Sequence, residues 1–279
     1  MKSSIENKKI VIFGAGGMLG TALLQAFKPY DVHGFDKTQV DITNNNAVFD
    51  RINRIKPDVV INSAAYTDVD GCEKNEKHAF DVNGHAVKTI AESCKRINSL
   101  LVHISTDYVF DGKEKFYKED DKPNPISIYG KSKALGEKNL IETLDNYYLI
   151  RTSWLFGKNG KNFVDTILKL AREKEELEVV EDQFGKPTYA VDLANKIREM
   201  IKTKKEFGIY HITNEGVCSW FQFAKKIVEL AKLNARVVPI TSEKLNRLAK
   251  RPKYSVLSNT KLSSLRQWNL ALEDYMSIK

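Results

Sequence analysis

The chain has 279 residues, a net charge of +8 and 42% hydrophobic residues. This length and composition suit one large domain with a buried core and exclude a disordered chain, and the three cysteines are too few and too dispersed for a disulfide framework. No apolar stretch approaches the roughly 20 residues that span a bilayer, and the polar N-terminus lacks the pattern of a signal peptide, so we expect no membrane segment and a cytoplasmic location.

In the first half of the chain, short apolar runs alternate with helical patterns. The runs that predict strands are 10–13, 32–35, 59–65, 100–106 and 147–153, and the helical patterns include 19–27, 48–55, 73–97 and 127–144. Because strands and helices alternate with short connections, the sequence predicts an α/β fold with a doubly wound parallel (Rossmann-type) sheet and helices on both faces.

The pattern changes after about residue 153. Helical segments at 163–176, 191–204 and 219–234 are separated by the β-like runs EVVED and GIYHIT, and Ser219 is a candidate N-cap for the last helix. No linker rich in Gly, Ser or Pro separates the two halves. We therefore expect a sheet domain over 1–153 and a smaller C-terminal lobe over 154–279, with some segments of the second half returning to the sheet domain.

A glycine-rich turn, GAGGMLG, joins the first predicted strand to the first helix. Gly14, Gly17 and Gly20 are spaced so that the turn is tight, the backbone can approach a pyrophosphate and the helix can pack on its strand. The N-terminus of that helix offers unpaired N–H groups to a phosphate. The sequence therefore predicts that the domain over 1–153 binds a dinucleotide.

An acidic residue closes the second predicted strand. Asp36 lies about 20 residues beyond the glycines, where an acid accepts hydrogen bonds from the adenosine ribose. This favours NAD over NADP, but Lys37 beside it could receive a 2′-phosphate. We therefore expect NADPH or NADH as the cofactor and leave the choice open.

A tyrosine and a lysine lie one helical turn apart. Tyr129 and Lys133 share a face of the predicted helix, and a cation beside a phenol favours the phenolate. We therefore expect Lys133 to lower the pKa of Tyr129 and to make it a proton donor and acceptor near neutral pH. The strand before this helix ends in Ser-Thr-Asp, so the hydroxyl of Thr106 lies at the carboxyl edge where open α/β sheets bind ligands.

Several longer motifs resemble one family. They are GAGGMLG, VINSAAYTDVDGCE, STDYVFDG, PNPISIYGKSKALGE, RTSWLFG, DQFGKPTY and RPKYSVLSNTKL. Over nearly its whole length the chain resembles the extended short-chain dehydrogenase/reductases, and among them the family of the dTDP-4-dehydrorhamnose reductases. Sugar-nucleotide dehydratases of the same superfamily carry an Asp-Glu pair after the catalytic threonine, whereas this chain has Asp107-Tyr108, so reduction is favoured over dehydration.

The resemblance implies the roles of individual residues. Thr106, Tyr129 and Lys133 would be catalytic: Tyr129 would protonate the oxygen of a sugar 4-ketone, Lys133 would hold the nicotinamide ribose and Thr106 would orient the carbonyl. The cofactor would be bound by Gly14, Gly17, Met18, Leu19, Gly20, Asp36, Asp41, Ile42, Ala64, Ala65, Tyr66 and Thr67, together with Tyr129 and Lys133. The substrate would be bound by Thr106, Asp107, Tyr129 and Trp154, with Arg251 as a candidate for the diphosphate because a planar fork suits that group.

The resemblance also implies an activity. The protein would reduce dTDP-6-deoxy-L-lyxo-4-hexulose to dTDP-L-rhamnose, a step of dTDP-rhamnose and cell-surface polysaccharide biosynthesis. Two alternatives stay open. The first is a non-catalytic NADP-binding subunit that resembles the regulatory beta subunit of methionine adenosyltransferase, and the second is a related nucleotide-sugar epimerase or reductase.

The basic charge leaves the partners open on its own. Residues 241–279 hold eight Lys and Arg against three acids, which is compatible with a nucleic acid, with an anionic small ligand or with solvated lysines. With the resemblance, we expect a dTDP-sugar as partner, no nucleic acid, no membrane and a monomer or homodimer. The five histidines show no ligand spacing, so no metal site is expected.

Overall fold

The structure is a computed structural model that describes residues 8–279. Residues 1–7, on which the expectation about a signal peptide partly rests, lie outside the described residues. Within residues 8–279, no helix is both long enough and apolar enough to cross a bilayer.

A six-stranded parallel sheet forms the centre of the protein, with the strand order β10-β5-β4-β3-β1-β2. Its strands are β1 (Lys9–Phe13), β2 (Asp31–Phe35), β3 (Val59–Asn62), β4 (Leu100–Thr106), β5 (Tyr147–Thr152) and β10 (Gly208–His211). The order reverses at β1, because the chain moves outward to β2 and then returns to β3 on the other side. The predicted doubly wound sheet is confirmed, and a ligand site is expected at the carboxyl end of these strands.

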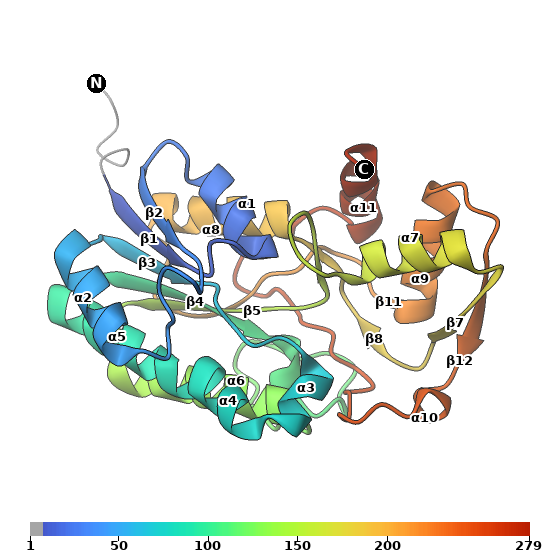
Figure 1. The fold of residues 1–279 in the computed structure, drawn as a ribbon, viewed down its shortest axis with the longest axis horizontal. Helices are drawn as coiled ribbons and strands as arrows, with labels where there is room; N and C mark the ends of the chain where they lie inside the picture. The colour runs from blue at the N-terminus through green and yellow to red at the C-terminus, as the bar shows by residue number, and fades with distance from the viewer. Residues whose placement is uncertain (1–7) are drawn as a thin grey trace.

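Both faces of the sheet are buried at its central strands, which explains why β1 and β3 are apolar without alternation. Ile10 and Ile12 pack on one side with α1 (Met18–Ala26) and α8 (Ala190–Thr203). Val11 and Phe13 pack on the other side with α2 (Asn45–Ile55), α5 (Ala86–Ile97) and α6 (Ile128–Thr143). Figure 1 shows these two helical layers on either side of the sheet.

The single helix predicted over 73–97 is wrong in detail, because the segment is divided. It forms α3 (Val69–Lys74), α4 (Glu76–Phe80), a π-helical turn (Asp81–His85) and α5. The π turn places the Asn83 side chain in the interior, where it bonds to the backbone of Tyr66 and to the hydroxyl of Ser132. Such π turns occur where a side chain needs a position that the regular helix does not give.

The second half of the chain builds a lobe beside the sheet (Figure 1). Its elements are β6 (Leu155–Phe156), α7 (Phe163–Glu173), β7 (Glu176–Val180), β8 (Phe184–Gly185), β9 (Thr188–Tyr189), β11 (Cys218–Ser219), α9 (Trp220–Leu230), β12 (Arg236–Ile240), α10 (Ser242–Leu245) and α11 (Trp268–Ser277). This lobe has its own apolar cluster, which includes Phe156, Phe223 and Tyr275. Ser219 caps α9 in a complete capping box with Gln222, so the predicted N-cap is confirmed.

Two elements of the second half return to the sheet. The edge strand β10 pairs with β5, and α8 packs on α1.

A 3-10 turn (Asp107–Val109) follows β4 at the sheet's carboxyl edge. The division into 1–153 and 154–279 stays a prediction.

Candidate active site

The glycine turn after β1 lies at the carboxyl edge of the sheet. Gly14 has a φ of +78°, and its N–H donates to the Phe35 carbonyl at 2.9 Å. A Cβ on Gly14 would lie 2.6 Å from the Ala64 nitrogen, and a Cβ on Gly20 would lie 2.0 Å from the Gly14 oxygen. Only glycine fits both positions, so the turn is closed as tightly as the spacing predicts.

The N-terminus of α1 is free of side-chain caps. Gly17 is the N-cap and has no side chain that could cover the first N–H groups of the helix, including those of Met18 and Leu19. Leu19 is buried in the core, whereas Met18 packs against glycines of the lobe segment 157–160. This end of α1 therefore fits a pyrophosphate, which would bind open N–H groups at the positive end of a helix.

Asp36 lies beside the turn, with its Cβ 3.3 Å from the place where a Cβ on Gly16 would be. Its Oδ1 accepts hydrogen bonds from the Thr38 hydroxyl at 2.6 Å and from the N–H groups of Thr38 and Gln39. The Thr38 hydroxyl in particular keeps the pKa of Asp36 below its usual value. The carboxylate is thus held in place and ionised, and its Oδ2 accepts no hydrogen bond from residues 8–279.

The other predicted cofactor residues follow β2 and β3. Asp41 forms a similar turn with Thr43, and the Ile42 side chain is buried in the core. Ala64, Ala65, Tyr66 and Thr67 form the loop after β3, beside the glycine turn. Asn83, which the sequence reasoning missed, fixes this loop by accepting from the Tyr66 N–H at 2.8 Å and donating to the Tyr66 carbonyl at 3.0 Å.

The predicted catalytic residues lie at the same edge of the sheet. Thr106 ends β4 and is buried, and its hydroxyl donates to Asp107 Oδ1 at 3.0 Å. Ser127 caps α6 through its side chain, and Glu73 of α3 accepts a hydrogen bond from the first N–H of the helix at 2.9 Å. Tyr129 therefore stands in the first turn of α6, with Lys133 one turn further on.

Lys133 is buried and tied to β4. Its Nζ donates to the Ile104 carbonyl at 2.6 Å and lies 3.5 Å from Nε2 of His103. The Asn62 Oδ1 accepts a hydrogen bond from the Ala64 N–H, so the amide Nδ2 of Asn62 faces His103 and donates to its Nδ1. Since Nδ1 is an acceptor, the neutral His103 ring carries its proton on Nε2, on the side of Lys133. Burial lowers the pKa of Lys133 to about 8 and holds the pKa of His103 well below its usual value.

Tyr129 differs from the prediction in its pKa. The sequence predicts a pKa lowered by Lys133, whereas in the structure burial raises it, and the neighbouring Thr106 offsets this only in part. Burial of the phenol is the largest cause, and the charge of Asp107 raises its pKa further, while Lys133 donates to the Ile104 carbonyl. The phenol is therefore a protonated acid across the neutral range.

Asp107 offers a buried carboxyl group for a ligand. It is 2% exposed, and its Oδ2 has no hydrogen-bond partner among residues 8–279. Burial raises the pKa of Asp107 to about 7. A buried oxygen without a partner is costly, so this carboxyl group fits a hydroxyl of a bound substrate.

Trp154 lies two residues after the end of β5 and has a φ of +48°. Its ring stacks on Trp220 of the lobe with centroids 3.5 Å apart and planes at 9°. Gly185 packs closely against the indole, because a Cβ added at this position would lie 2.5 Å from the ring. Trp154 is partly exposed and forms a rigid aromatic wall where the lobe meets the edge of the sheet.

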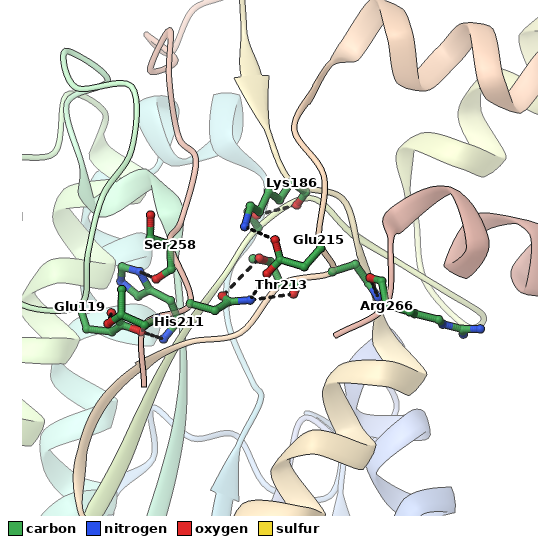
Figure 2. Close-up of polar contacts among 11 residues, drawn as sticks. Glu119, Lys186, His211, Thr213, Glu215, Ser258 and Arg266 are labelled. Carbon is green, nitrogen blue, oxygen red and sulfur yellow. Dashed lines mark hydrogen bonds and ion pairs between the residues drawn. The ribbon is translucent and has the colours of Figure 1, made fainter. Parts of the chain in front are cut away.

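A polar network joins the lobe to the segments that follow β10 (Figure 2). Lys186 is buried and pairs with Glu215 at 2.9 Å, and Figure 2 shows the two side chains pointing toward each other. Asn259 donates to the Thr213 carbonyl and to Glu215. Because these residues come from three distant parts of the sequence, they hold the lobe in a fixed position at the edge of the sheet.

Arg251, the predicted diphosphate ligand, lies in the segment that follows α10. Its guanidinium binds the Asp70 carboxylate through two hydrogen bonds of 2.8 and 3.0 Å. Asp70 was not singled out in the sequence, and nothing local marks it, since its partner is 181 residues away. Among residues 8–279, no three His, Cys, Asp or Glu side chains gather as a metal-binding group.

The sheet order and the glycine turn define the class of Rossmann-type reductases, to which the short-chain dehydrogenase/reductases belong. Residues 8–278 match the family model described as "RmlD substrate binding domain". Relatives that share 35–42% of their residues with this chain over nearly its whole length are named dTDP-4-dehydrorhamnose reductase. The chain therefore belongs to the family of the dTDP-4-dehydrorhamnose reductases, as the motifs predict.

Three relatives illustrate the similarity. The chain is 42% identical to the spore coat polysaccharide biosynthesis protein SpsK of Bacillus subtilis (strain 168), covering 96% of each chain. It is 42% identical to the dTDP-4-dehydrorhamnose reductase of Aggregatibacter actinomycetemcomitans, covering 95% of this chain and 97% of the relative. The crystal structure of dTDP-4-dehydrorhamnose reductase from Bacillus anthracis in complex with NADP is 40% identical, with a TM-score of 0.95 over 98% of this chain and 100% of the other.

Proposed function

We propose that this protein reduces the 4-keto group of dTDP-6-deoxy-L-lyxo-4-hexulose to give dTDP-L-rhamnose, with NADPH or NADH as the reductant. One observation carries the proposal. Thr106, Tyr129 and Lys133 converge at the carboxyl edge of the sheet that carries the glycine turn, in a chain that belongs to the family of the dTDP-4-dehydrorhamnose reductases.

The cofactor fits the first half of this edge. Gly14, Gly17 and Gly20 shape the turn, the open N-terminus of α1 accepts the pyrophosphate and Asp36 accepts the ribose hydroxyls. The remaining proposed contacts are Met18, Leu19, Asp41, Ile42, Ala64, Ala65, Tyr66 and Thr67. When bound, the cofactor supplies a hydride to carbon 4 of the sugar.

Tyr129 supplies the proton. Its raised pKa keeps the phenol protonated until negative charge develops on the ketone oxygen, which then takes the proton from the Tyr129 hydroxyl. Thr106 orients the same oxygen, and Lys133 holds the nicotinamide ribose from the next turn of α6. One hydride and one proton reach the ketone, and an alcohol results.

The sugar nucleotide occupies the space between the sheet edge and the lobe. Asp107 binds a sugar hydroxyl through its free oxygen, Trp154 forms a wall of the pocket and Arg251 binds the diphosphate. The domain over 1–153 thus binds the dinucleotide, and the lobe within 154–279 binds the substrate.

The free, buried cysteines Cys72, Cys94 and Cys218 support a reducing, cytoplasmic location.

We expect the protein to be a monomer or a homodimer, and sedimentation equilibrium distinguishes these two states.

A turnover assay tests the proposed function. The purified protein is incubated with the keto-sugar nucleotide and either NADPH or NADH, and the product is identified by NMR. We expect consumption of the reduced cofactor only when the keto sugar is present, with dTDP-L-rhamnose as the product. Cofactor binding without turnover would indicate a regulatory subunit, and a keto product of changed stereochemistry would indicate an epimerase.

A further inference from the structure

A single carboxylate joins the sheet domain to the chain that leaves α10. Asp70 lies in the first turn of α3, three residues after the proposed cofactor loop ends at Thr67. Residues 247–257, here named the strap, run from α10 back to the side of α3 (Figure 1). The strap then continues past Gly112 toward Tyr117, which pairs with Leu257.

Three groups of the strap converge on Asp70. Arg251 Nη1 donates to Oδ1 at 3.0 Å and Nη2 donates to Oδ2 at 2.8 Å, so the pair is bidentate. The Ala249 N–H donates to Oδ1 at 3.0 Å, and Arg247 Nη1 lies 3.3 Å from Oδ2. The hydrogen bonds from Arg251 hold the pKa of Asp70 far below its usual range, so the carboxylate stays charged at neutral pH.

The Arg251 guanidinium keeps one edge open. Of its five N–H donors, two bind Asp70 and a third binds the Ala249 carbonyl at 2.6 Å. The Nε–H and the second Nη2–H have no acceptor among residues 8–279. These two donors lie on the same side of the planar group and match two oxygens of a phosphate.

The Arg251–Asp70 pair lies near the proposed catalytic residues. The charges of Arg251 and Asp70 both act on the pKa of the Tyr108 phenol. The Tyr108 ring in turn packs edge-to-face on Tyr129, with centroids 5.9 Å apart. The side chain of Arg251 is 15% exposed, so a ligand can reach it.

We infer that Asp70 is a positioning residue, which holds Arg251 so that its Nε–Nη2 edge faces the diphosphate of the sugar nucleotide. This inference rests on the proposed function. Asp70 does not touch the ligand itself, because both its oxygens already accept hydrogen bonds from the strap. Preorganisation of this kind lowers the cost of fixing a flexible arginine when the ligand binds.

The binding of dTDP, measured by titration calorimetry, tests the inference with variants of the full chain. Asp70→Asn keeps the shape and removes the charge, and we expect it to weaken dTDP binding about tenfold, which corresponds to one charge-assisted hydrogen-bonded pair. In turnover, the KM for the keto sugar rises while kcat and the affinity for NADPH stay unchanged. Asp192→Asn is the matched control, because it breaks a comparable bidentate pair with Arg266, and we expect wild-type dTDP binding.

A double-mutant cycle separates positioning from a structural role. Arg251→Gln weakens dTDP binding, and the addition of Asp70→Asn causes no further loss if Asp70 acts only through Arg251. Wild-type or tighter dTDP binding by Asp70→Asn would overturn the inference, as would losses that multiply in the double variant or an equal loss of NADPH affinity. A wild-type protein that binds NADPH but neither dTDP nor the keto sugar would instead contradict the proposed function, and the inference with it.

Discussion

The turn proposed for the cofactor pyrophosphate is made of backbone from one short stretch of sequence, whereas the strap depends on side chains that meet across 181 residues. At the glycine turn, Gly14 and Gly20 leave no room for a Cβ, and no side chain caps the first N–H groups of α1. At the strap, Arg251 is flexible in itself and is fixed by Asp70.

The comparison shows that the glycine turn and the strap respond differently to amino-acid substitution. At Gly14 and Gly20 a substitution disturbs the fold itself, so this part of the turn has little freedom to vary and suits a pyrophosphate, which NADH and NADPH share. The strap is made of side chains, so a single substitution at Asp70 or Arg251 can change it without a clash in the backbone. The predictions below test this difference, from the largest effect to the smallest.

The largest effect is expected at the glycine turn. In Gly20→Ala the new Cβ would lie 2.0 Å from the Gly14 oxygen, so the turn must open, and we expect a loss of about 3 kcal/mol in the free energy of unfolding together with loss of NADPH binding. Gly17→Ala is the contrasting variant, because its Cβ would make an ordinary contact at 3.4 Å. It should keep the stability and lose NADPH affinity only. Denaturant unfolding and NADPH fluorescence measure both, and equal stability of the two variants would contradict the account.

Lys133→Met should lower kcat/KM for NADPH about a hundredfold, because the ribose contact and the buried cation are lost. Since burial lowers the pKa of Lys133 to about 8, the wild-type kcat/KM should fall as the pH rises through 8 and the ammonium loses its proton. In Lys133→Met this alkaline decline disappears. Lys131→Met, on an exposed position of the same helix, should keep the wild-type profile. If kcat/KM still declines near pH 8 in Lys133→Met, the decline belongs to the titration of another group.

The smallest effect concerns the choice of cofactor. Asp36→Asn keeps the oxygen that accepts from Thr38 but removes a charge beside the ribose, so the preference should move toward NADPH by about threefold to tenfold. The ratio of kcat/KM for the two cofactors measures this. Asp31→Asn, at the other end of β2, should leave the ratio unchanged. A shift toward NADH would show that Asp36 does not face the ribose.

The sequence predicts the parts of this protein that depend on local spacing. Five of the six sheet strands, the glycine turn, the Tyr129–Lys133 turn and the Ser219 cap all follow from the chemistry of neighbouring residues, whereas β10 is recognisable only as a β-like run. The division of the helix predicted over 73–97 could not be read in the same way, because it follows from the buried contacts of Asn83 with a distant loop.

Long-range electrostatics also lay beyond the sequence. The pattern predicts that Lys133 is close to Tyr129, but it contains no sign that the Ile104 carbonyl on β4 would bind the ammonium or that burial would dominate the pKa of the phenol. Asp70 is the same case, since only the fold brings the strap to α3. A polar residue inside an apolar run, such as His103, was the one available signal, and in the core it is hydrogen-bonded to Asn62.

The central claim is that the Tyr129 hydroxyl gives its proton to the ketone, and the single-turnover rate of Tyr129→Phe tests it most directly. Bound NADPH is mixed with the keto-sugar nucleotide, and the decay of its absorbance is followed alongside the NADPH dissociation constant. Tyr147→Phe, at the amino-terminal end of β5 and so at the end of the strand away from the proposed site, is the control. The account predicts a loss of about a hundredfold or more in Tyr129→Phe with unchanged NADPH affinity. A wild-type rate in that variant would contradict it.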